Sequence, residues 1–208
     1  MLESRITLAL LISGLFLSGC ATATLPQGPD IYSLAPRSNT GTILVAHVVD
    51  QRTDKQHLGN IGALGLSMKT DPSELVAKEV VAALYQEGIN STLGHASSDN
   101  PTAFPQTAQQ ANAQGILALA IQSISIKSFD ALMDPPTAEI VLQATLYDNQ
   151  GNAVESENIT GHVQRKINTF AADRATGELV GEAAHDAAQR LVNHPTFSAT
   201  LKKVATSK

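Results

Sequence analysis

Alternation between apolar and polar residues predicts a group of long strands in the second half of the chain. Between residues 138 and 147 the even positions up to 146 are apolar, whereas Glu139, Gln143 and Thr145 are polar. A period of two is typical of a strand with one buried and one solvated face. The preceding segment is apolar on both faces in its first half, and the following one is polar, which is typical of an edge strand. The predicted strands are 116–127, 138–147 and 154–166, with a turn at 149–152.

Two helices are predicted from apolar positions that recur every three to four residues. The first begins at Asp71-Pro72, where an acidic cap precedes a proline that suits the first helical turn, and ends at Gly88. The second covers about 173–193, where an alanine-rich ridge is flanked by Leu179 and Leu191. Small side chains on that ridge let a helix lie close to a sheet.

The remaining elements complete an α+β pattern. A strand rich in β-branched residues, 42–49, precedes the first helix, and it is apolar on both faces, as expected inside a sheet. A short strand follows at 89–93, and a short helix at 105–114 is expected to end at Gly115. The order β-α-β-(α)-β-β-β-α predicts a two-layer sandwich, a mixed sheet with helices packed on one face.

The N-terminus reads as an export signal that ends in a cysteine motif. The apolar run 6–17 follows Arg5 and is too short to span a bilayer, but it has the length of a signal-peptide core. It ends in Leu17-Ser18-Gly19-Cys20, which resembles the bacterial lipobox. Small residues before the cysteine suit the signal peptidase. Cys20, the chain's one cysteine, would carry a diacylglycerol thioether and an N-acyl chain, and several acyl chains anchor a protein stably.

The lipobox divides the chain and predicts its location. Residues 1–19 are the expected signal peptide, 20–40 a lipidated flexible tether rich in Pro and Gly, 41–195 a periplasmic domain and 196–208 a frayed C-terminal tail. Ala21 stands where an Asp tends to retain Gram-negative lipoproteins at the inner membrane. In a Gram-negative host we therefore expect a periplasm-facing protein of the outer membrane.

The composition of the chain argues against several classes of function. The net charge of −5 argues against nucleic-acid binding, which needs a basic face, and 4% aromatic residues without Trp provide few stacking platforms. We expect no cofactor beyond the lipid, no metal site and no catalytic residues, because nucleophile motifs are missing from the sequence. Glu182 and His185 have a spacing seen in di-iron bundles, but such a site needs a second copy and more carboxylates, so a solvated helix face is the favoured interpretation.

The segment 53–70 is the region that we expect to contact a partner. It contains three glycines and no apolar period, and connections of this length are often functional. Asp50 and Arg52 at its base point the same way on an extended chain, which favours a structural clamp over the alternative, a site for an anionic group. The apolar residues expected to contact the partner are Leu58, Ile61, Leu64, Leu66 and Met68.

Taken in order, these elements resemble the YajG-type bacterial lipoproteins. The resemblance covers most of residues 42–193 and includes the Asp-x-Arg that ends the first strand and the Leu84-Tyr-Gln-Glu-Gly88-Ile89 that ends the first helix. The element order is also similar to the TolB N-terminal domain and to LptE, which implies a module of envelope assembly. The expected function is a non-catalytic binding or assembly module with an envelope protein partner. The alternatives are a small-ligand or lipid carrier that serves a transporter, and a periplasmic hydrolase.

Overall fold

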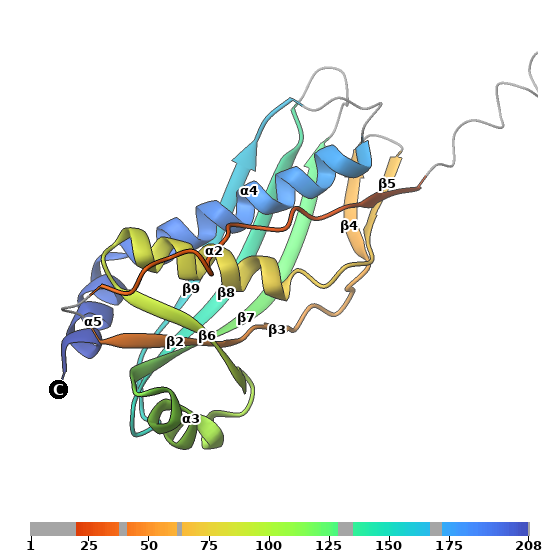
Figure 1. Ribbon diagram of the computed structural model, residues 1–208. Helices are drawn as coiled ribbons and strands as arrows, with labels where there is room; N and C mark the ends of the chain where they lie inside the picture. Colours follow the sequence, from red (N-terminus) through yellow and green to blue (C-terminus); the bar gives the residue numbers. More distant parts are fainter. Residues whose placement is uncertain (1–19, 38–40, 62–63, 129–134, 167–171, 208) are drawn as a thin grey trace, which may run out of the picture.

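The computed structural model describes residues 20–37, 41–61, 64–128, 135–166 and 172–207, in which one mixed sheet carries helices on both faces (Figure 1). Helices α2, α4 and α5 cover one face of the sheet, and the short α3 lies against the other. The strands are β1 (Cys20–Ala23), β2 (Thr42–His47), β3 (Val49–Asp50), β4 (His57–Ile61), β5 (Leu64–Met68), β6 (Asn90–Ser97), β7 (Ala113–Ser128), β8 (Thr137–Asp148) and β9 (Ala153–Gln164). The helices are α2 (Ser73–Gln86), the 3₁₀ turn η2 (Pro101–Ala103), α3 (Phe104–Ala111), α4 (Ala172–Asn193) and α5 (Pro195–Thr206).

The longest strand, β7, organises the sheet. On one side it pairs antiparallel with β8, and β8 pairs antiparallel with β9. On the other side one half of β7 pairs parallel with β2 and β3, and its C-terminal end pairs parallel with β4. Beyond these, β2 pairs with β6, β4 with β5, and β5 with β1. The predicted α+β sandwich is confirmed, including the meander β7–β8–β9 and the polar edge strand.

Strand β2 is buried on both faces, as its sequence predicts. Ile43 and Val45 belong to the large core under α2, α4 and α5. Leu44 and Ala46 belong to a smaller core under α3, together with Phe104 and Ile116. The second face of the sheet therefore also has apolar contacts, where α3 packs. The sequence predicted helices on one face, and α3 is the exception to that prediction.

The alanine-rich face of α4 lies very close to the sheet. A Cβ on Gly161 of β9 would overlap the Ala183 carbonyl and the Ala187 amide, so glycine is needed where helix and strand meet.

Of the two predicted glycine stops of helices, one is present and the other is not. Gly88 ends α2 at φ +84°, whereas α3 ends at Asn112, at φ 50°, and not at Gly115. Asparagine tolerates the left-handed region that ends a helix.

The segment expected to be a loop, 53–70, contains the hairpin β4–β5, and that prediction was wrong. Gly59, at φ +127°, lies so close to the Ile126 carbonyl of β7 that a Cβ would overlap it. Glycine at this position permits close packing of β4 on β7, although the glycine-rich composition of the segment suggests mobility. The hairpin joins β7 on one side and β1 on the other, and so extends the sheet.

Both chain ends of the predicted domain are more ordered than expected. The described part of the tether, 20–37, forms β1 and then runs along α2 and α4, with Ala21, Ala23 and Ile31 buried. The expected tail, 196–208, forms α5 through residue 206. Its buried Phe197 and Leu201 join the large core. A flexible tether and a frayed tail were therefore wrong predictions, because burial of a few apolar side chains holds both segments.

Candidate functional site

The site with the clearest chemical identity is the N-terminal strand β1, which begins at Cys20. Cys20 lies beside Gly65 of β5 in a parallel register. Leu17, Ser18 and Gly19, the expected recognition residues of the signal peptidase, lie outside the described residues. Ala21, the residue expected to direct sorting, is 8% exposed and belongs to the large core.

Polar contacts attach β1 to both layers of the domain. The Thr22 amide donates to the Asp173 carboxylate of α4 at 2.9 Å, and the Thr24 amide donates to the Asp173 carbonyl at 3.2 Å. On the sheet side, the Ser67 hydroxyl donates to the Ala21 carbonyl at 3.3 Å. The first residues after the predicted lipid attachment are therefore fixed in position.

Two glycines on α4 make room for the chain that follows β1. A Cβ on Gly177 would overlap the Thr24 carbonyl, and one on Gly181 would lie 2.7 Å from the Pro26 ring. The two glycines are four residues apart and so share one helix face. This spacing was the sequence signal that could have predicted docking of residues 24–26 on α4.

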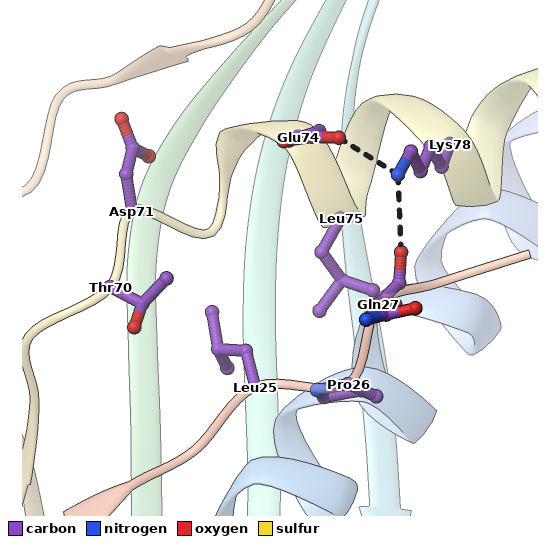
Figure 2. A pocket seen from close by; sticks show the side chains of 8 residues that line it. All are labelled: Leu25, Pro26, Gln27, Thr70, Asp71, Glu74, Leu75 and Lys78. Carbon is purple, nitrogen blue, oxygen red and sulfur yellow. Dashed lines mark hydrogen bonds and ion pairs between the residues drawn. The ribbon is translucent and has the colours of Figure 1, made fainter.

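The docked chain, residues 24–37, also contacts α2 beside a cavity of about 390 Å³ (Figure 2). The Lys78 ammonium donates to the Gln27 carbonyl at 3.3 Å and pairs with Glu74 at 2.8 Å. These contacts hold residue 27 against the helix. The residues lining the cavity are Leu25, Pro26, Gln27, Thr70, Asp71, Glu74, Leu75 and Lys78.

The far end of the docked chain is held by a paired amide. The Asn90 side chain accepts from the Arg37 amide and donates to the Arg37 carbonyl, each at 2.7 Å. The Arg37 guanidinium also lies 4.7 Å from the centre of the Tyr85 ring, in cation–π range. The segment between β1 and β2 is therefore attached along its described length.

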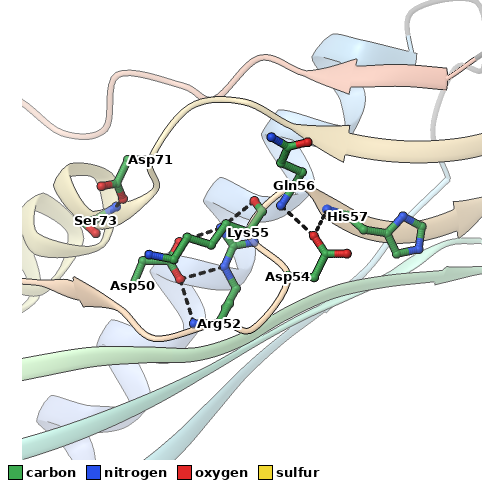
Figure 3. A network of polar contacts seen from close by, with 8 residues as sticks. All are labelled: Asp50, Arg52, Asp54, Lys55, Gln56, His57, Asp71 and Ser73. Atoms are coloured by element: carbon green, nitrogen blue, oxygen red, sulfur yellow. Dashed lines mark hydrogen bonds and ion pairs between the residues drawn. The ribbon is translucent and has the colours of Figure 1, made fainter.

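Asp50 and Arg52 form a buried ion pair at the start of the hairpin segment (Figure 3). Arg52 donates Nε and Nη2 to the two carboxylate oxygens of Asp50 at 2.9 and 2.8 Å, and Nη2 also donates to the Lys55 carbonyl at 3.1 Å. The side chains are 4% and 6% exposed for Arg52 and Asp50. Because each charge is buried against the other, the geometry favours the predicted clamp over a site for an external anion.

The electrostatics of the clamp follow from this geometry. Burial raises the pKa of Asp50, but the side-chain and backbone hydrogen bonds from Arg52 and its positive charge outweigh burial, so the pKa lies below its usual value. Asp50 is therefore charged at neutral pH, and the pair links the end of β3 to the turn before β4.

The side chains expected to contact a partner are largely internal. Leu58, Leu66 and Met68 are between 0% and 1% exposed and belong to the large core. As surface contacts for a partner these three were wrong predictions, because the hairpin turns them toward the helices. The side chains of Ile61 and Leu64 lie outside the described part of the chain.

Histidine and carboxylate side chains of α4 contact polar partners on other segments. His185 Nδ1 of α4 lies 2.9 Å from the Glu79 carboxylate of α2, and Glu182 pairs with Arg165 at 2.9 Å. Within the described ranges, no group of three or more His, Cys, Asp or Glu is arranged to hold a metal ion. None of the described helices is long and apolar enough to cross a bilayer.

Comparison with known proteins finds similarity in fold and not in sequence. No protein-family model and no curated protein matches it by sequence, so the resemblance to YajG-type lipoproteins stays a prediction. Among solved structures, protein XCC0632 of Xanthomonas campestris, of family DUF330, matches with a TM-score of 0.54 and 14% identity, over 89% of this chain and 99% of that one. The PelC dodecamer of Paraburkholderia phytofirmans matches at 0.52 and 13%, over 88% and 96%.

A third structure extends the same fold to another organism. The hypothetical protein CT253 of Chlamydia trachomatis matches with a TM-score of 0.50 and 12% identity, over 81% of this chain and 99% of that one. These matches cover nearly the whole length of each neighbour. The chain therefore has the fold of these bacterial proteins, and the identities are too low to assign more than the fold.

Proposed function

We propose that this chain is a lipid-anchored lipoprotein of the outer membrane that faces the periplasm and acts as a non-catalytic module for binding or assembly in the envelope. The observation that carries the proposal is the position of Cys20. It is the last residue of the lipobox and lies in β1 beside Gly65 of β5, so the predicted mature chain starts at a residue that is paired in the sheet.

The fold supports an assembly role over a carrier. A carrier needs an apolar cavity between helices and sheet, but the described interface is occupied by side chains that include Leu142, Leu179 and Leu191, each 0% exposed. One structure that shares the fold, PelC, is a dodecamer. That neighbour supports assembly as a use of this fold.

A candidate surface for the protein partner is the sheet face opposite α4, which we call the open face. It carries neutral hydrogen-bonding side chains from β7, β8 and β9 and from the residue after β3. The Gln122 amide donates to Gln51 at 2.8 Å and to Gln143 at 3.1 Å, and Thr145 and Ser156 share a hydrogen bond of 3.1 Å. Strand β9 pairs only with β8 among the described strands, but α4 covers part of its outer edge, where the His162 amide donates to the Asp186 carboxylate at 2.8 Å. The residues of the open face are Gln51, Gln122, Gln143, Thr145, Ser156 and Asn158.

The anchor is tested by mass spectrometry of the protein isolated from membranes. We expect a mature chain that starts at Cys20 and carries diacylglycerol and an N-acyl group, and fractionation with the outer membrane. Cys20→Ser should leave an unprocessed precursor. Normal processing of that variant, or a mature wild-type chain without lipid, would refute the anchor.

The partner surface is tested by photocrosslinking in intact cells. A photoreactive amino acid at Asn158, which is exposed on the open face, should give a discrete crosslinked species. The matched control is Arg190, which is exposed on α4 on the other side of the sheet. Equal crosslinking at both positions, or crosslinking only at Arg190, would exclude the open face as the partner surface.

A further inference from the structure

The predicted lipid attachment site is joined to the fold without a spacer. Cys20 itself lies in β1, paired with Gly65 of β5, and the residues after it are fixed as well: Ala21 and Ala23 are buried, and the Thr22 amide donates to Asp173. A lipoprotein with a flexible tether could move away from its membrane by the length of that tether. In this chain no free residue separates the anchor from the sheet.

Several other strands end where Cys20 lies. The registers place Cys20 beside Gly65, at the N-terminal end of β5, and Ile61 of β4 beside Ser128 of β7. The same end of the sheet continues with the pair Thr137–Gln164, where β8 begins and β9 ends. In Figure 1 the start of β1 lies with the tips of β4 and β5 and the N-terminal end of α4. Cys20 is therefore part of one end surface of the domain.

Exposed cationic side chains occur at this end, together with carboxylates. Lys127 near the end of β7 is 68% exposed, and Arg174 in the first turn of α4 is 83% exposed. Lys166, two residues after β9, is also exposed. Carboxylates lie at the same end, because Glu139 is 3.9 Å from Lys127 and Glu178 pairs with Arg174 at 2.8 Å. Lysine and arginine beside a bilayer are attracted by lipid phosphates.

We infer that the domain stands directly on the phospholipid surface that holds its anchor, with the Cys20 end of the sheet against the headgroups. This inference rests on the proposed acylation of Cys20. The opposite end, with the β8–β9 turn and α3, then points away from the bilayer. Because β8 spans 12 residues, that turn lies up to about 40 Å from the lipid surface. The docked β1 sets this distance and orientation, and it presents the open face sideways along the membrane.

The test uses the lipidated full-length protein in vesicles of phosphatidylethanolamine and phosphatidylglycerol. Because acylation consumes the chain's one cysteine, a cysteine introduced elsewhere is the only free thiol for a fluorescent label. Lys127→Cys reports on the proposed contact end, and Gln150→Cys in the β8–β9 turn is the matched control at the far end. We expect a nitroxide-headgroup lipid to quench the probe at 127 several-fold more strongly than the probe at 150.

A linker variant tests whether β1 sets the distance. A Gly-Ser linker of about 12 residues, with ends on the order of 20 Å apart, is inserted after Thr22, and Ala21 and Thr22 are repeated behind it so that the lipobox and residues 21–23 of β1 keep their sequences. Quenching at 127 should fall toward the value at 150. Unchanged quenching in the linker variant would overturn the role of β1.

The two proposals fail in distinguishable ways. Mass spectrometry of each labelled protein shows whether Cys20 is acylated. Equal quenching at 127 and 150 in acylated protein overturns the orientation and leaves the anchor intact. Protein that carries no lipid on Cys20 overturns the proposed function itself.

Discussion

The buried pair of Asp50 and Arg52 gives a prediction whose size can be worked out from the structure. Arg52→Met keeps the length and much of the volume of the side chain but removes its charge and three hydrogen bonds, two to Asp50 and one to the Lys55 carbonyl. The Asp50 carboxylate then stays buried and, among the described residues, keeps the backbone amide of residue 52, at 3.1 Å, as its donor.

The size of the expected loss in unfolding free energy depends on how deeply the ion pair is buried. An exposed ion pair contributes about 0–1 kcal/mol, whereas removing one partner of a buried pair costs about 3–5 kcal/mol, since the remaining charge loses its compensation. The two side chains are 4% and 6% exposed, so the larger range applies. With a urea m value of about 2 kcal/mol/M, the midpoint of unfolding at pH 7 should fall by roughly 1.5–2.5 M.

The pH dependence has a definite sign. In the wild type the pKa of Asp50 is lowered by Arg52 against the effect of burial, so its contribution is complete above the unfolded pKa of about 3.9 and is lost as the pH falls through the folded value. In Arg52→Met burial acts without Arg52, so the folded pKa of Asp50 rises and protonation relieves the penalty at low pH. The stability difference between wild type and variant should therefore shrink between pH 7 and pH 4.

Urea unfolding of the non-lipidated mature chain, followed by circular dichroism at both pH values, measures these quantities. The control is the double variant Asp50→Leu with Arg52→Met, which leaves no buried charge and should lose less stability than the two single variants together. A loss below about 1 kcal/mol for Arg52→Met at pH 7, or a difference that grows toward pH 4, would refute the buried clamp.

Three further predictions concern the segments whose order the sequence did not predict. Leu66→Ala, at a fully buried position of β5, should lower the free energy of unfolding by about 2–5 kcal/mol, and a loss typical of a surface residue would mean that the hairpin is outside the core. Phe197→Ala in α5 should cost about 3–5 kcal/mol in the same urea assay, against a negligible loss if this segment is a frayed tail. Gly177→Ala should cost about 1–3 kcal/mol because its Cβ overlaps the Thr24 carbonyl, and it should speed amide hydrogen exchange at Thr22 and Thr24; slower or unchanged exchange there would contradict the docking of residues 24–26 on α4.

Periodic patterns in the sequence determined the core architecture. The alternation in 138–147 and the apolar run in 42–49 predicted strands that the structure contains, with the buried faces as expected. The ridge of α4 and the stop at Gly88 were equally local signals. Each of these features depends on neighbouring residues within one element, and such information is present in a single sequence.

The elements that could not be predicted from the sequence form through contacts with residues that are distant along the chain. β1 has four residues and β4 and β5 five each, which is too short for a clear period. They are strands because β7 extends far enough to pair with β4 after it has passed β2. Gly59 looks like a source of mobility, but its neighbour Ile126 shows that it permits close packing.

The lipobox and the structure determine different parts of the candidate site. The order of residues around Cys20 was sufficient to predict a lipid anchor, because a peptidase and an acyl transferase act on a short extended segment. Whether that anchor is tethered or fixed depends on α4, about 150 residues later, where Asp173 and Gly177 accept the chain. Only the tertiary structure could decide this, because the free energy that holds β1 comes from contacts between segments that are far apart in the sequence.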